Sequence, residues 1–204
     1  MIVGLYDRYL AFRLRKAAPQ LPETVALVLT ERDLLESGAY ETLNSVIRWA
    51  FEFDAEQLVI YVSVLDTGVV ERLKTQLERL ETPYEVAVRS PNHESRADAP
   101  VQVSIGLGGK HEFATAVRSV AEAVERGELD PESITEEDIE ARLVFQTAPD
   151  LVIKTGGERL SDFMIWQSVY SELYFTDVNW RNFRRRDYLR ALRDYQNRKR
   201  RFGE

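Results

Sequence analysis

The sequence of 204 residues contains no cysteine, which excludes disulfide bonds and thiolate metal sites. It also lacks an uninterrupted apolar run of about eighteen residues, the length that a membrane-spanning helix needs. Its first nineteen residues do not show the order of positive charge, apolar core and small cleavage-site residues that marks a signal peptide. Together these absences favour a cytoplasmic protein.

Lysine is scarce as well, because the chain has five lysines against twenty-two arginines. The net charge is −7, yet residues 181–204 alone hold ten basic and three acidic side chains. Such a basic end could attract phosphates or an acidic lipid surface, or could simply be the solvated face of a helix. The basic residues gather at one end without an aromatic and glycine motif, so we do not expect nucleic-acid binding.

The remaining composition is that of an ordinary globular protein, with 44% hydrophobic and 30% charged residues. The length suits a single domain covering residues 1–204, with a leading helix in 1–20 and a basic C-terminal helix and tail in 185–204. In the leading helix Val3, Tyr6, Leu10 and Leu14 recur at helical spacing, which predicts an amphipathic helix. It could pack on the domain, or contact a membrane surface or a partner.

Short apolar runs alternate with helical patterns along the chain, which predicts a single α/β domain with a mostly parallel sheet and helices on both faces. The predicted strands are 24–29, 58–64, 84–88, 101–107 and 151–153. Helices are predicted over 39–53, 69–80 and 111–126, and one more is capped by Thr135 with Asp138 at its third position. Two further helices are expected after residue 153, the last from about Asp187 to Arg200.

The last third of the chain carries the strongest chemical signal. From Pro149 it reads P-D-L-V-I-K-T-G-G-E-R-L-S-D-F, later S-E-L-Y-F, and it finishes on R-R-F-G-E. The apolar residues 151–153 predict a strand that ends in a glycine turn, with Lys154 at the carboxyl end of the strand. Ligands of parallel sheets bind at the carboxyl ends of strands, where glycines let the backbone approach a phosphate and cations such as Lys154 and Arg159 supply charge.

These motifs, from Asp150 to Gly203, resemble the cis-prenyltransferases, the family of undecaprenyl and dehydrodolichyl diphosphate synthases. The resemblance is in register apart from one residue missing between Glu158 and Arg159. It implies an α/β fold, a magnesium ion, and the condensation of isopentenyl diphosphate with an allylic diphosphate in the synthesis of polyprenyl lipid carriers. It also implies a dimer. Peripheral contact of the protein with a membrane surface is an alternative that the sequence leaves in place.

The resemblance assigns roles to residues one by one. Residues that would bind isopentenyl diphosphate are Lys154, Gly156, Gly157, Arg159, Ser161, Arg201 and Gly203. Glu172, in S-E-L-Y-F, would be linked to magnesium. Lys154 stands where the family has arginine, so it keeps the charge without the planar fork that binds two phosphate oxygens. Structural alternatives are that Glu172 lies on a helix surface and that Ser161 caps a helix.

A second segment, Gly108-Gly109-Lys110, resembles the G-G-R that precedes the family's central helix. The same glycines would equally serve a plain junction between a strand and a helix.

The family's N-terminal aspartate motif, M-D-G-N-x-R-W-A, is missing. Aligning the strand at 25–29 with it puts Thr30 at the aspartate position, and the segment before the next helix is reduced to residues 31–38. A threonine hydroxyl is a poor substitute for a carboxylate as a magnesium ligand. Asp33 or Asp66 could take over, although a misplaced carboxylate costs about a hundredfold in rate.

Three hypotheses follow. The chain is an accessory subunit that is weak or inactive alone and donates Arg201 to Gly203 to an aspartate-containing homologue. Alternatively, it is a self-sufficient, diverged polyprenyl diphosphate synthase. In the third, it is a non-enzymatic binding module on the same fold.

Overall fold

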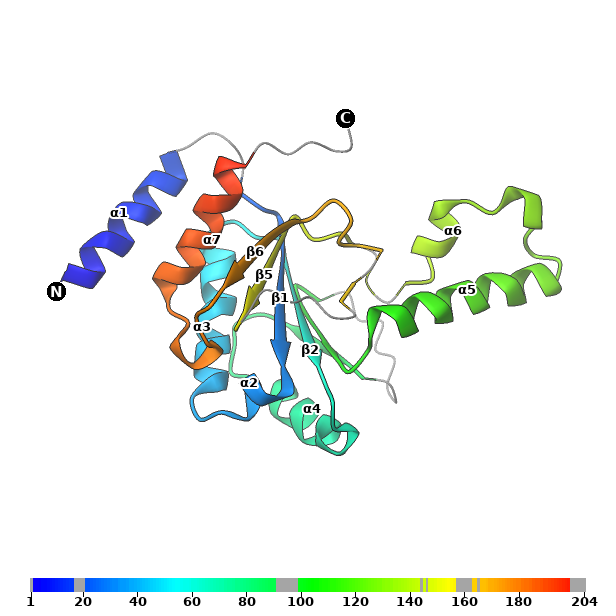
Figure 1. Ribbon diagram of the computed structural model, residues 1–204, viewed down its shortest axis with the longest axis horizontal. Helices are drawn as coiled ribbons and strands as arrows, with labels where there is room; N and C mark the ends of the chain where they lie inside the picture. Colours follow the sequence, from blue (N-terminus) through cyan, green and yellow to red (C-terminus); the bar gives the residue numbers. More distant parts are fainter. Residues whose placement is uncertain are drawn as a thin grey trace.

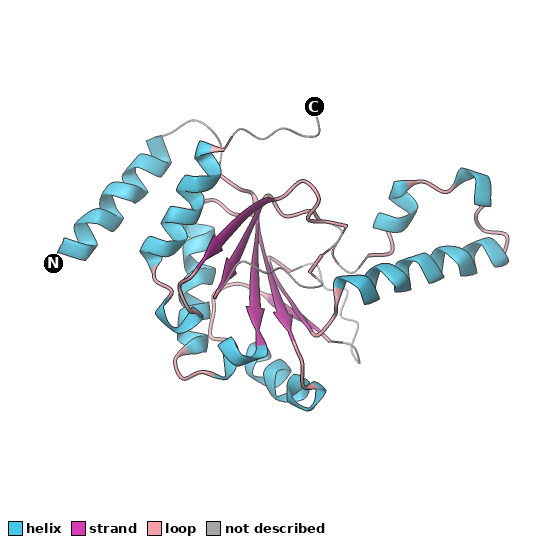
Figure 2. Cartoon of the chain, in the orientation of Figure 1, coloured by secondary structure: helices cyan, strands magenta, loops and turns pink. Residues whose placement is uncertain are grey.

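The computed structural model describes residues 2–16, 21–90, 99–143, 145, 147–156, 163–164 and 166–198. In this part of the chain six strands form one sheet in the order β3-β4-β2-β1-β5-β6, and all neighbouring strands are parallel (Figure 2). The strands are β1 (Thr24–Thr30), β2 (Gln57–Ser63), β3 (Val86–Arg89), β4 (Val101–Ile105), β5 (Leu151–Thr155) and β6 (Glu172–Thr176). The prediction of a single α/β domain with a parallel sheet is therefore confirmed.

Seven α-helices are described, most of them connecting the strands. They are α1 (Ile2–Lys16), α2 (Glu31–Leu35), α3 (Ala39–Glu52), α4 (Val70–Glu78), α5 (Gly109–Glu125), α6 (Glu136–Glu140) and α7 (Arg185–Asn197). Short 3-10 helices lie at Thr67–Val69, Pro131–Ser133 and Trp180–Asn182. The polar segment expected to be a loop, 90–100, lies mostly outside the described residues.

The two faces of the sheet are covered differently. Alternate residues of β1, such as Leu27 and Leu29, pack into a large core with α3, α4 and α7, and α1 adds Leu10 and Leu14 to it. On the other face a smaller cluster is closed by Phe145, Phe163 and Met164, none of which lies in a helix. Among the described residues, helices cover one face, and the expectation of helices on both faces is correct for that face. The second face is covered by residues without regular secondary structure, and α5 projects away from the sheet (Figure 1).

Helix α3 shows why the sequence pattern succeeded for this face. Leu43, Val46, Ile47 and Ala50 are spaced by three and four residues, and all four are fully buried. The stripe packs against the sheet and α7. Of the residues expected on the buried side of the leading helix, Leu10 and Leu14 are buried, whereas Tyr6 is 40% exposed.

Strand β6 was not predicted. The sequence analysis expected a helix between residue 153 and α7, but residues 166–170 form turns and Glu172–Thr176 pair with β5. The described residues there include no α-helix, only the 3-10 helix Trp180–Asn182. Leu173, Tyr174 and Phe175 are bulky, and they fit a pleated, half-buried edge strand better than a helix. Glu172 is therefore the first residue of an edge strand and not an acid on a helix surface.

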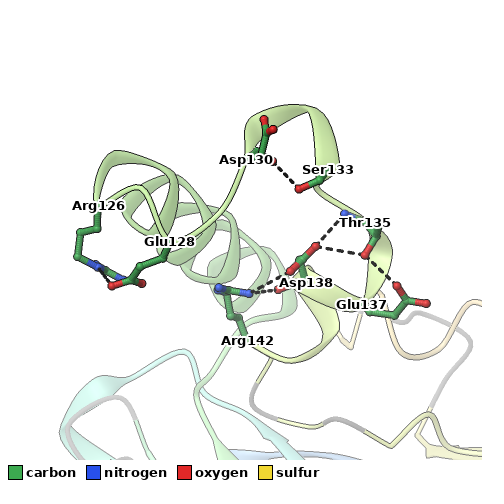
Figure 3. A network of polar contacts seen from close by, with 8 residues as sticks. All are labelled: Arg126, Glu128, Asp130, Ser133, Thr135, Glu137, Asp138 and Arg142. Carbon is green, nitrogen blue, oxygen red and sulfur yellow. Dashed lines mark hydrogen bonds and ion pairs between the residues drawn. The ribbon is translucent and has the colours of Figure 1, made fainter.

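Helices α5 and α6 form an arm beside the sheet (Figure 1). Figure 3 shows the polar contacts that hold its tip together. The Asp138 carboxylate accepts a hydrogen bond from the Thr135 amide at 2.9 Å, which confirms the predicted cap of α6. The same acid lies 3.9 Å from Arg142, and Arg126 pairs with Glu128 at 2.8 Å. These contacts all join residues within the tip, whereas Trp166 and Gln167 donate to Glu140 and Glu112 and so tie the arm to the rest of the domain.

Candidate functional site at the carboxyl edge of the sheet

The carboxyl ends of β1 and β5 lie side by side at the point where the strand order changes direction. From β1 the chain crosses to β2 on one side, and from β5 it crosses to β6 on the other. In open parallel sheets such a switch point is the usual ligand site. Val28 is in register with Lys154, so the last residues of the two strands, Thr30 and Thr155, belong to the same edge. Of the predicted site residues, Lys154 and Gly156 thus lie at the edge where open parallel sheets usually bind ligands.

Lys154 is half-buried at this edge. Its Nζ donates a hydrogen bond to the carbonyl of Thr155 at 2.5 Å. Burial lowers the pKa of Lys154, because desolvation penalises the ammonium, while the charge of Asp33 opposes the shift. The lysine therefore lies at the edge within electrostatic reach of Asp33, an acid that follows β1.

Gly156 forms the turn after β5. Its φ is +71°, a conformation that side-chain-bearing residues rarely adopt, and its amide donates to the carbonyl of Thr176 at 3.0 Å. The nearest atom that an added Cβ would meet is Asn179 Oδ1 at 4.0 Å, so the requirement for glycine comes from the backbone and not from lack of space.

Thr30 ends β1 and caps α2, a helix that the sequence analysis did not predict. The Thr30 amide and hydroxyl both donate to one oxygen of Asp33, each at 2.8 Å, and the Asp33 amide donates back to the Thr30 hydroxyl at 3.3 Å. This reciprocal arrangement is a capping box. The residue at the expected aspartate position is therefore engaged in starting a helix, and Asp33 is engaged in capping it.

Asp66, the other acid considered as a replacement, also holds backbone. Its Oδ1 accepts from the Gly68 amide at 2.9 Å and caps the 3-10 helix after β2. Glu31 lies beside it and is 8% exposed, and its carboxylate accepts from the amides of Leu65 and Asp66 at 2.9 and 3.1 Å. The sequence analysis missed Glu31. An acid directly after a buried strand, followed by a short polar connection, is the signal that could have drawn attention to it.

Glu172 lies at the opposite edge of the sheet. It is in register with Leu151, the first residue of β5, whereas Lys154 is paired with Phe175. Three residues of a parallel strand span about 10 Å, so the length of the strand separates Glu172 from the lysine. Glu172 pairs with Arg198 at 3.1 Å, beyond the end of α7. One copy of the chain therefore does not bring these two predicted site residues together.

The other predicted residues for isopentenyl diphosphate, Gly157, Arg159, Ser161, Arg201 and Gly203, lie outside the described residues. Gly108 and Gly109 mark the start of α5, Gly108 as its N-cap and Gly109 as its first residue. That placement is the strand-to-helix junction considered as the structural alternative.

The described residues do not provide a complete magnesium site. Within them no group of three His, Asp or Glu side chains is placed to hold a metal ion. The acids nearest the carboxyl edge, Asp33, Asp66 and Glu31, already accept backbone hydrogen bonds. We therefore derive no chemical step through a metal bound by this chain alone.

A groove that the sequence analysis did not foresee lies between the start of α3 and the segment before α7. Its volume is about 400 Å³, and it is lined by Ser37, Gly38, Glu41, Thr42, Ser45, Trp49, Arg181, Phe183 and Arg184. Arg184 already donates to the backbone carbonyls of Arg181 and Phe183. The sequence showed only that arginines are dense in this region.

Several known proteins are similar to this chain in sequence, and others are similar in fold. A family model described as "Putative undecaprenyl diphosphate synthase" matches residues 61–203. A tritrans,polycis-undecaprenyl-diphosphate synthase (geranylgeranyl-diphosphate specific) of Methanopyrus kandleri is 32% identical over 251 residues, covering 99% of this chain and 91% of the relative. An isoprenyl transferase of Deinococcus radiodurans is 33% identical, covering 98% and 91%. Because this chain has 204 residues, part of the Methanopyrus protein within the aligned span has no counterpart here.

Other relatives match over a shorter span. A synthase of the same name from Methanocaldococcus jannaschii is 52% identical over 109 residues, which cover 51% of this chain but only 39% of the relative. This chain thus spans well under half of that relative's length in the match.

Among solved structures, lavandulyl diphosphate synthase from Lavandula x intermedia, in complex with dimethylallyl diphosphate, superposes with a TM-score of 0.73 at 24% identity. The superposition covers 90% of this chain and 99% of that one. A probable undecaprenyl diphosphate synthase from Campylobacter jejuni gives 0.69 at 22% identity, covering 92% and 100%. At these identities the likeness concerns the fold. The family match over residues 61–203 and the relatives aligned over almost the whole chain agree with the parallel sheet, and they show that the chain belongs to the cis-prenyltransferase family of undecaprenyl diphosphate synthases.

Proposed function

We propose that this protein takes part in polyprenyl diphosphate synthesis as the accessory subunit of a heteromeric cis-prenyltransferase. One observation carries the proposal. At the switch point, β1 ends in a capping box at Thr30, where the family motif has aspartate, while β5 ends in a cation and a glycine turn. On this proposal the chain keeps the half of the site for isopentenyl diphosphate, while a helix cap stands in place of the half that would release the allylic diphosphate.

The reaction joins an allylic diphosphate to isopentenyl diphosphate. The allylic carbon–oxygen bond ionises, pyrophosphate leaves, the isopentenyl double bond attacks the allylic carbon, and a proton is lost. A complete site would hold a magnesium ion, whose charge would offset that of the diphosphate. The residues of this chain suit a narrower task, since Lys154 can bind a diphosphate oxygen and the positive φ of Gly156 turns the chain directly after the strand.

The separation of Glu172 from Lys154 supports a dimer. Because the two residues lie at opposite edges of the sheet, they can act on one substrate only if a second chain supplies one of them. Arg201 follows Arg198, the residue that pairs with Glu172, by three positions. The dimer partner that we propose is an aspartate-containing homologue, which receives the Arg201 to Gly203 tail.

The test is incorporation of labelled isopentenyl diphosphate onto an allylic primer with magnesium. We expect little or no product from this chain alone and strong product when it is mixed with an aspartate-containing homologue from the same cell. The variant Arg201→Ala should abolish the stimulation, while Arg193→Ala, which removes an exposed arginine from α7, should leave it intact. Full stimulation by Arg201→Ala would contradict the donation of the tail.

A self-sufficient enzyme is the second candidate, and one electrostatic interaction favours a particular acid for it. The negative charge of Asp33 raises the pKa of Lys154 against the effect of burial, so this acid acts on the lysine at the carboxyl edge. If the chain alone elongates a primer, Asp33→Ala should abolish the activity and Asp66→Ala should not. Activity that survives both substitutions would leave this candidate without a mechanism.

Undetectable binding of isopentenyl diphosphate together with no stimulation of any homologue would instead indicate a binding module. We also propose that the accessory subunit makes peripheral contact with a membrane.

A further inference from the structure

The groove between α3 and the segment before α7 is a cavity that the proposed function does not use. Its volume of about 400 Å³ lies in the usual range for small-molecule sites, roughly 300 to 1,000 Å³. One wall is a single face of α3, because its lining residues there recur every three or four positions. Figure 1 shows α7 beside α3, on the helix-covered face of the sheet. Lys154 does not line the groove, which is therefore not the site at the carboxyl end of β5.

Two arginines line the groove without an acidic partner. In the part of the chain that the structure describes, neither the Arg181 nor the Arg184 guanidinium lies within 4.0 Å of a carboxylate, whereas Arg185 pairs with Glu52. The Arg184 Nη1 donates to the carbonyls of Arg181 and Phe183 at 2.8 and 3.0 Å. These two bonds hold the guanidinium in place and leave its Nε and Nη2 donors for a ligand. A guanidinium held in this way suits a phosphate, whose oxygens it can bind in pairs.

Both walls of the groove are fixed by the core. The Trp180 Nε1 donates to the carbonyl of Ala39 at 3.1 Å, which ties the segment before α7 to the start of α3. Phe183 is buried and stacks on Trp180. On the α3 side the Trp49 ring packs against Tyr188, a fully buried residue of α7, with ring centres 6.4 Å apart. The groove is therefore preformed, and a ligand does not have to order its walls.

The other lining groups suit sugar hydroxyls and a flat ring. The Glu41 carboxylate has no cation within 4.0 Å among the residues that the structure describes, so it can accept hydrogen bonds from hydroxyls. The Thr42 hydroxyl donates to a carbonyl of its own helix at 3.2 Å, and its oxygen can therefore accept as well. Trp49 supplies an indole ring on which a base can stack. Because the acid is not paired with the arginines, a ligand can place its phosphate and its hydroxyls at different parts of the groove.

We propose that this groove binds a nucleoside phosphate. The phosphate binds Arg181 and Arg184, the sugar hydroxyls donate to Glu41, and the base lies against Trp49. Inorganic phosphate has no group for the acid or the indole, and the nearby carboxylate repels it, so it should bind more weakly than the nucleotide. The inference goes beyond the proposed function and does not depend on prenyl transfer.

The experiment is isothermal titration of the full chain with AMP, GMP, CMP and UMP, and with ribose 5-phosphate as the probe that lacks a base. We expect at least one nucleotide to bind about tenfold more tightly than ribose 5-phosphate, because a base stacked on an aromatic ring adds affinity. Arg181→Gln should weaken nucleotide binding by roughly tenfold to a hundredfold, the range for a lost hydrogen bond to a charged group. Trp49→Leu should weaken the binding of the nucleotide and leave that of ribose 5-phosphate unchanged.

The matched control is Arg193→Gln, which removes an exposed arginine of α7 outside the groove and should bind nucleotides as the wild type does. Arg181 is also exposed, so the urea midpoint of Arg181→Gln should equal that of the wild type. Failure of all four nucleotides to bind, or normal binding by Arg181→Gln, would overturn the proposal. Nucleotide binding that is lost in Lys154→Ala but kept in Arg181→Gln would also overturn it, because the phosphate would then lie at the end of β5. Affinity for isopentenyl diphosphate, measured on Arg181→Gln and expected to be unchanged, separates this result from the fate of the proposed function.

Discussion

The carboxyl ends of β1 and β5 are neighbours in the sheet, yet they are used in opposite ways. At the end of β1 the polar groups of Thr30 and Asp33 satisfy each other and start α2. At the end of β5 the Lys154 ammonium is half-buried and Gly156 turns the chain away. At the first end the polar groups satisfy one another, whereas the second end presents a cation and a glycine turn. If the proposed function holds, half of a ligand edge has become a helix cap while the other half has been retained.

The largest effect should come from the β5 end. Replacing Lys154 with alanine removes the charged donor, so affinity for isopentenyl diphosphate should fall by roughly tenfold to a hundredfold, the range for a hydrogen bond to a charged group. Isothermal titration of the purified chain measures it. Lys74→Ala is the control, because this lysine pairs with Glu78 on α4, away from the edge. Equal affinities for the two variants would show that the β5 end binds no diphosphate.

The protonation of Lys154 gives a second way to test that end. Burial lowers the pKa of this lysine, so its ammonium loses the proton at a lower pH than an exposed lysine does. Diphosphate affinity should therefore decrease as the pH rises through that lowered pKa. In Lys154→Arg the guanidinium stays charged, and the affinity should be nearly constant over the same alkaline range. Parallel pH profiles for the two proteins would assign the binding charge to another residue.

Substitution at the β1 end should change stability and not binding. Thr30→Val removes the hydroxyl of the capping box and should lower the free energy of unfolding by about 1 kcal/mol. Urea denaturation measures this, with Thr75→Val as the control, because the Thr75 hydroxyl bonds only to a carbonyl within α4. A variant that keeps its stability but loses diphosphate affinity would mean that Thr30 belongs to the ligand site.

The smallest effect concerns the amino edge of the sheet. Arg198 pairs with Glu172 at 3.1 Å and with Asp194, but these groups are partly exposed. Arg198→Ala should therefore lower the free energy of unfolding by no more than about 1 kcal/mol. If the pair also positions the tail for a partner, stimulation of the homologue should fall far more than stability does. A loss of stability without loss of stimulation would confine the pair to a structural role.

The sequence predicted the parts of the fold that depend on periodicity. The buried strands β1 and β2 and the amphipathic helix α3 were found because their apolar residues follow a single clear pattern. Strand β6 was missed because an edge strand is half-buried on both sides and shows no strong alternation. Helix α2 was missed because five residues carry too little periodicity, and only the pairing of Thr30 with Asp33 reveals it.

The candidate site was predictable where a residue follows a strand directly. Lys154 and Gly156 were placed correctly at a carboxyl edge, since a parallel strand fixes where its end lies. The opposite position of Glu172 could not be read from the motif, because it depends on whether S-E-L-Y-F forms a strand or a helix. The same holds for Asp33, whose hydrogen bonds exist only once α2 has formed.

The pairing of β1 with β5 has a consequence for how the chain is made. Thr24–Thr30 meet Leu151–Thr155 only after more than a hundred intervening residues have been synthesised. Until then β1 and β2 form a strongly apolar parallel pair whose outer edge lacks its neighbour, and such edges invite wrong pairing with other chains. Contacts so distant in sequence are also closed slowly. The nascent protein should therefore need protection by a chaperone until β5 leaves the ribosome.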